Sequence, residues 1–151
     1  MAATTGNTDP LFIALPLISS VLVTAANTSS QGGGTIGTDI FLVETAGADG
    51  TFWGILRLIP TATAPTTTTA TVMRIFFSTQ SSGATSSANT YLFQEVTLAA
   101  IPADNATTAV TWYDVAINQA VPTGMNLLVT NHAAPAANTA WRAIILKSGD
   151  Y

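Results

Sequence analysis

Charged side chains are scarce in this sequence. They make up 8% of its 151 residues, whereas soluble proteins usually contain about 25%. The apolar fraction of 48% is ordinary, so threonine, serine, asparagine, glutamine and alanine take the place of the missing charges. Such a surface binds water but repels neighbouring molecules only weakly. The composition therefore favours a protein that packs against others, with a stable threonine-rich monomer as the alternative.

Positive charge is especially sparse. The four cations, Arg57, Arg74, Arg142 and Lys147, are scattered along the chain, and the formal net charge is −4. A nucleic-acid-binding protein normally has a basic stripe that neutralises phosphates, and an anionic membrane surface attracts clustered cations. We therefore expect neither a nucleic-acid partner nor a membrane partner.

The sequence has no cysteine and a single histidine, His132. The lack of cysteine excludes a disulfide framework, a thiolate zinc site and a cysteine nucleophile. No nucleophile motif accompanies the histidine, no calcium-loop pattern occurs, and the two glutamates are both expected to pair with arginine. We therefore predict no catalytic residue, no enzyme activity, no metal site and no cofactor.

An apolar run, "PLFIALPLISSVLV", covers residues 10–23. No Lys or Arg precedes it as in a secretory leader, and it is too short and too interrupted for a membrane span. We interpret residues 1–16 as an extended arm and 17–151 as one domain. The arm could cover its own sheet or reach a neighbouring subunit. Its candidate interface residues are Leu11, Phe12 and Ile13.

Eight apolar or β-branched runs alternate with turn-forming clusters, and helical periodicity is hard to find. The runs cover residues 17–25, 39–45, 51–59, 70–78, 90–99, 111–119, 125–131 and 139–147. Proline and glycine lie almost wholly between the runs, as a strand ladder requires. The exception, Gly54, indicates a bulge or a close packing contact. Eight short strands in one domain predict an all-β fold, an antiparallel β-sandwich with jelly-roll-like topology.

Charged residues within the runs predict two structural ion pairs. If Asp49 and Gly50 form a tight hairpin turn, strand 51–59 folds back on strand 39–45. One carboxylate then lies diagonally opposite one guanidinium on the same face of the sheet. A second such match occurs in the next strand pair. The expected pairs are Glu44 with Arg57 and Arg74 with Glu95.

The aromatic residues lie inside predicted strands among aliphatic neighbours. We expect Trp53 and Trp141 to pack in the core. Trp112 and Tyr113 are adjacent, so in a strand they face opposite ways, and one of them is a candidate for an exposed interface or ligand site. A sugar-stacking platform of these aromatic rings would make the protein a carbohydrate-binding module, which is a second hypothesis for its function.

Short strand-and-turn patterns, such as "AINQAVPTGMNLLVT" and "WRAIILKSGDY", are distributed over nearly the whole chain. In these patterns the chain resembles a group of small phage and prophage proteins of similar length that end in Gly-Asp-Tyr. We take that group to be virion components, either capsid decoration (cement) proteins or tail-associated proteins. The residues that carry the resemblance are Asn27, Gly50, Arg74, Glu95, Pro122, Gly124, Trp141, Gly149, Asp150 and Tyr151.

The resemblance implies a role on the surface of a virion. We expect a decoration protein that is made in the host cytoplasm and then binds and stabilises the lattice of the major capsid protein. A homo-oligomer is expected, with a trimer first and a dimer second. The alternatives are a tail- or connector-associated virion protein and a carbohydrate- or receptor-binding module. No catalytic residue comes with the resemblance.

Overall fold

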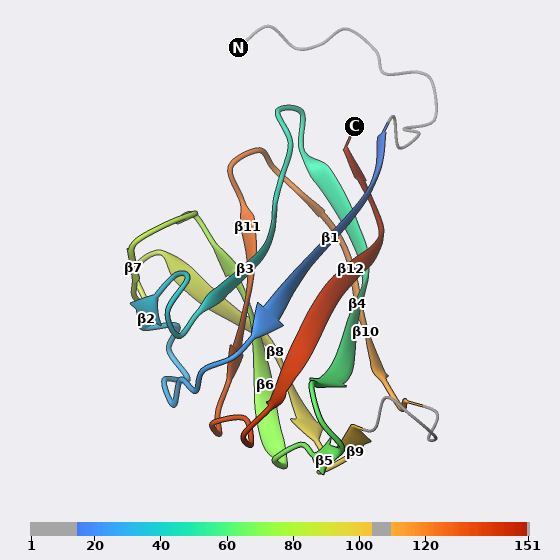
Figure 1. Ribbon diagram of the computed structural model, residues 1–151. Coiled ribbons are helices and arrows are strands. Elements are labelled where there is room, and N and C mark those ends of the chain that lie inside the picture. The colour runs from blue at the N-terminus through green and yellow to red at the C-terminus, as the bar shows by residue number, and fades with distance from the viewer. Residues whose placement is uncertain (1–14, 104–109, 151) are drawn as a thin grey trace, which may run out of the picture.

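Two four-stranded antiparallel sheets form the body of the protein (Figure 1). The computed structural model describes residues 15–103 and 110–150. Sheet A has the strand order β1-β12-β4-β10, and sheet B has the order β3-β11-β6-β8. No residue in the described ranges belongs to a helix. The predicted all-β class and antiparallel sandwich are confirmed.

Eight long strands account for the two sheets, and each overlaps one predicted run. They are β1 (Leu15–Val23), β3 (Phe41–Thr45), β4 (Thr51–Ala62), β6 (Thr71–Ser78), β8 (Thr90–Leu98), β10 (Tyr113–Val121), β11 (Asn126–Asn131) and β12 (Thr139–Asp150). Four two-residue strands were not predicted, because two residues are too few to show an alternating pattern. These are β2 (Gly34–Thr35), β5 (Thr66–Thr67), β7 (Ala84–Thr85) and β9 (Pro102–Ala103).

Strand β1 begins at Leu15, one residue before the predicted end of the N-terminal arm. Leu15 pairs with Asp150, and Pro16 pairs with Gly149. Proline fits here because β1 is an edge strand, where a missing N–H need not break a ladder. The rest of the predicted arm, including Leu11, Phe12 and Ile13, lies outside the described residues.

The hairpin predicted at Asp49-Gly50 is wrong. Gly50 N–H does donate a turn hydrogen bond of 3.1 Å to the Gly47 carbonyl, but the turn carries the chain from sheet B to sheet A. Strand β4 pairs with β12 and β10, and β3 pairs with β11. A central position gives β4 two neighbours instead of one. The turn residues alone predict that β3 pairs with β4, but both strands instead pair with segments far away in the sequence.

The core lies between the two sheets. Trp53 and Trp141 are almost fully buried in it, at 0% and 1% exposure, as predicted. Apolar residues of both sheets surround them: Val43, Leu56, Leu58, Met73, Ile75, Val115, Leu127, Val129, Ala143 and Ile145.

Gly54 lies opposite an irregularity in the neighbouring strand. The β10–β4 register shifts between Ala116 and Gln119, and Asn118 there has a positive φ of 49°. Asparagine tolerates this left-handed conformation better than most residues. The expectation that Gly54 marks a bulge is confirmed, with the extra residue on the partner strand.

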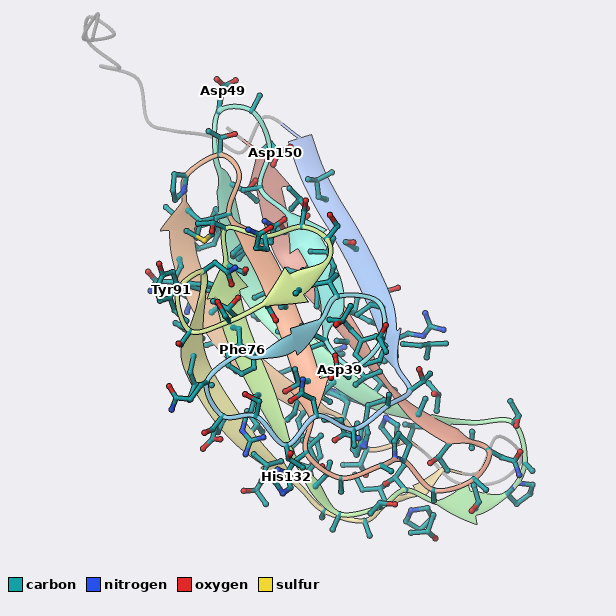
Figure 2. The ribbon with its side chains drawn as sticks, turned by 90° about the vertical axis from the view of Figure 1, so that its left-hand side faces the viewer. Asp39, Asp49, Phe76, Tyr91, His132 and Asp150 are labelled. Carbon is teal, nitrogen blue, oxygen red and sulfur yellow. The ribbon has the colours of Figure 1, made fainter. Side chains whose placement is uncertain are left out.

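Part of the outer face of sheet B is covered by its own chain. Figure 2 shows β2, β7 and their loops across this side of the molecule, where Phe76 lies. A second apolar cluster forms beneath the cover from Ile40, Phe76 and Leu128, all fully buried. Asn27 fixes the covering segment, because its side chain donates to Gly33 O and accepts from Ser29 N–H. The cover therefore buries the outer side chains of Phe76 on β6 and Leu128 on β11, whereas several residues of the edge strand β8 stay exposed.

Candidate interaction surface

Sheet A has an outer face that can be traced from its register. Three rows of directly opposed residues cross the sheet, and their neighbours in sequence point into the core. The rows are Leu22–Arg142–Ile59, Ser20–Ile144–Arg57–Asp114 and Leu146–Ile55–Ala116. Ile18 lies beside the third row, where β12 carries one extra residue relative to β1. We call these residues the sheet A face.

The sheet A face is mostly apolar. Ile18 is 77% exposed and Leu22 38% exposed, while Ile55, Ile59 and Ile144 are partly exposed. An antiparallel sheet that faces water on one side normally alternates apolar and polar residues along each strand. Here both faces are mostly apolar. This explains why "TFWGILRLIP" carries a single charge.

No described segment lies over the sheet A face in Figure 1, in contrast with the covered face of sheet B. The three rows span about 14 Å across four strands and about 13 Å along them. Contiguous apolar patches on monomers commonly mark sites of association. The sheet A face is therefore the strongest candidate site of function in the described chain.

One ion pair lies on this face. Arg57 Nε and Nη2 each donate a 2.7 Å hydrogen bond to a different Asp114 oxygen, and these bonds raise the pKa of Arg57. The guanidinium also stacks on Trp112, with 4.8 Å from Cζ to the ring centroid. The predicted partner of Arg57 was Glu44. That prediction is wrong, because the two residues lie on different sheets.

Glu44 instead lies between the sheets, 7% exposed. Its Oε2 accepts a 2.9 Å hydrogen bond from Ser148 of β12. Burial raises the pKa of Glu44 above its ordinary 4.5, and the charge of Asp150 raises it further. The Ser148 hydroxyl lowers the pKa of Glu44, and so does the Trp53 N–H. This N–H lies nearby but has no well-formed hydrogen-bond partner.

The predicted pair of Arg74 and Glu95 is present. The two residues are directly opposed on β6 and β8, and Arg74 Nε donates to Glu95 Oε1 at 2.6 Å. Arg74 is buried, and its Nη1 also reaches Asn27 O at 3.4 Å and His132 Nδ1 at 3.2 Å. These contacts tie the cover of sheet B to the sheet, so the cluster has a structural role.

Trp112 lies directly before β10, which begins at Tyr113, and the two side chains point to opposite sides of sheet A, as those of adjacent residues in an extended chain do. Trp112 is 51% exposed. Tyr113 is half-buried against Trp141, with ring centroids 6.1 Å apart, and its hydroxyl accepts a bond from Ala99 N–H. The two rings do not share one platform. Tyr91, the other exposed aromatic residue in the described part of the chain, belongs to β8 in the other sheet.

Within residues 15–103 and 110–150, no group of three or more metal-ligating side chains occurs. In the same ranges, no helix has the length and apolar character needed to cross a bilayer. Comparisons of the chain with models of protein families, with curated protein sequences and with solved structures give no match.

Proposed function

We propose that this protein is a structural component of a phage virion, a capsid decoration protein that binds the lattice of the major capsid protein. The observation that carries the proposal is the uncovered apolar face of sheet A. A protein that stabilises a shell must bury surface on rigid neighbours, and apolar area removed from water contributes about 25 cal/mol per Å² before association costs. The low charge of the whole chain suits the same role.

The sheet A face is the centre of this proposed interface. An interface of standard size covers about 800 Å² on each partner, which is more than the three rows provide. Surrounding residues must contribute as well, and Trp112 at one margin is of the type enriched at interfaces. The apolar N-terminal residues Leu11, Phe12 and Ile13 would add to it. A closed homo-oligomer, a trimer first, is the expected assembly.

The strand order supports a jelly roll, a fold that occurs in viral capsid domains. When the eight long strands are numbered in chain order, sheet A reads 1-8-3-6 and sheet B reads 2-7-4-5. Strands of the first and second halves of the chain therefore alternate in both sheets. Such alternation is what a ribbon of the two paired halves gives when it wraps around a core.

Purified virions of the phage or prophage that encodes the chain provide the test. Gel electrophoresis with quantitative mass spectrometry should find the protein in a copy number comparable to that of the major capsid protein. Its absence from the particle would overturn the proposal. A few copies per particle would place it in the tail or connector instead.

A further inference from the structure

A pocket of about 390 Å³ opens at one end of the sheet A face. It lies where β1, β4 and β12 meet the loop before β12, and its lining includes Leu22, Ala62, Asn138, Ala140 and Arg142. Asn138 has a positive φ of 64°, and its carbonyl accepts a 3.0 Å hydrogen bond from Thr63 N–H. This turn closes one end of the pocket.

The pocket combines an apolar wall with one cation. Leu22, Ala62 and Ala140 supply aliphatic surface, and Arg142 lies beside Leu22 in the first row of the sheet A face. The Arg142 guanidinium makes a long contact of 3.4 Å to Ser20 Oγ. The two salt bridges in the described ranges belong to Arg57 and Arg74. Arg142 is thus a partly buried cation without a carboxylate among the described residues.

We infer that this pocket receives an acidic segment of the partner protein. An aliphatic side chain of that segment lies against Leu22 and Ala140, and a neighbouring carboxylate pairs with Arg142. Charge complementarity supplies the specificity, because a guanidinium binds a carboxylate through two parallel hydrogen bonds. The inference rests on the proposed function, since it names the chemistry of the partner at the margin of the same surface.

A protein segment fits better than a free small molecule because the pocket continues into the sheet A face. Leu22 and Arg142 belong to both. A partner that covers the face and inserts one side chain into the pocket removes both apolar areas from water in a single contact. A carboxylate at that point also fixes the register of the partner on a mostly apolar surface.

Nuclear magnetic resonance of the full ¹⁵N-labelled chain tests the inference directly. The probe is a blocked tetrapeptide that contains leucine followed by glutamate, compared with the same peptide carrying glutamine. The glutamate peptide should shift the amide signals of Leu22, Ala140 and Arg142. The glutamine peptide should bind about tenfold more weakly, as should the glutamate peptide to the Arg142→Gln variant. Gln94→Glu, at an exposed position of β8 in the other sheet, changes the net charge by the same one unit and should leave this binding unchanged.

Equal responses to the two peptides, or no response at the pocket, would overturn the inference. This result is separable from the proposed function. Shells that bind the wild-type protein and the Arg142→Gln variant equally well would keep the decoration role and remove the pocket from it. Peptide binding by a protein that is absent from virions would keep the pocket as a binding site and remove the decoration role. Self-association that Arg142→Gln abolishes would assign the pocket to a second copy and contradict a different partner.

Discussion

Ser148 on β12 donates a hydrogen bond of 2.9 Å to Glu44 on β3, and so joins the two sheets inside the sandwich. Nearby, the Thr51 hydroxyl donates to Asp150 and accepts from Gly47 N–H. Two carboxylates therefore lie near each other at one end of the sandwich. A buried carboxylate that is ionised must be stabilised by such donors.

Stability should depend on pH through Glu44. Its pKa in the folded protein is raised by burial, so the folded state holds this proton more tightly than the unfolded state does. The stabilisation is complete below the ordinary pKa of 4.5 and is lost as pH rises through the folded value. The Glu44→Gln variant has no carboxyl group at this position, so it does not lose this stabilisation as pH rises. Denaturation of both proteins between about pH 4 and pH 8 should therefore show Glu44→Gln gaining relative stability with pH. Parallel curves would contradict the raised pKa.

The two ion pairs should differ in their contribution to stability. Glu95→Ala leaves the buried Arg74 guanidinium without its carboxylate and should lower the free energy of unfolding by about 2 kcal/mol. Asp114→Ala is the matched control, because it removes a carboxylate from an exposed pair, and its effect should be smaller. Urea denaturation measures both. Equal losses would show that burial of Arg74 does not matter.

Gly32 is required where the cover of sheet B passes β8. Its φ is +73°, and an added Cβ would lie 2.6 Å from Thr90 Cγ2. Gly32→Ala should therefore cost about 2 kcal/mol, from backbone strain and overpacking together. Gly37 has a similar φ of +88° but nothing within 4 Å of the added Cβ, so Gly37→Ala carries the strain alone. Thermal unfolding of the two variants should rank them in this order, and the reverse order would refute the packing argument.

Much of the fold follows from sequence pattern. The eight runs predict the eight long strands because alternation of apolar residues and interruption by proline and glycine are local properties. The burial of Trp53 and Trp141 follows from the same alternation. The opposed pair of Arg74 and Glu95 was found because β6 and β8, neighbours among the long strands, are also neighbours in sheet B.

Strand pairing between distant segments could not be predicted. The Asp49-Gly50 turn has the residues of a hairpin turn, yet it connects two sheets. The hairpin interpretation therefore paired Glu44 with Arg57 incorrectly. Asp114, the true partner of Arg57, comes from a strand far along the chain. The sheet A face was also missed as a surface. The sequence does indicate it, because both the odd and the even positions of "TFWGILRLIP" are mostly apolar, so both faces of this strand are mostly apolar. Sequence alone does not tell whether the second face is covered by the chain or left open.

The sheet A face should be the surface through which the protein contacts a shell. Ile55→Asp places a charge in the middle of this face, and Gln94→Asp adds the same charge at an exposed position of β8 in sheet B. Circular dichroism and denaturation should first show both variants folded. Co-sedimentation with shells assembled from the major capsid protein alone should then recover wild type and Gln94→Asp with the shells and leave Ile55→Asp in solution. Recovery of Ile55→Asp at the wild-type level would contradict the account.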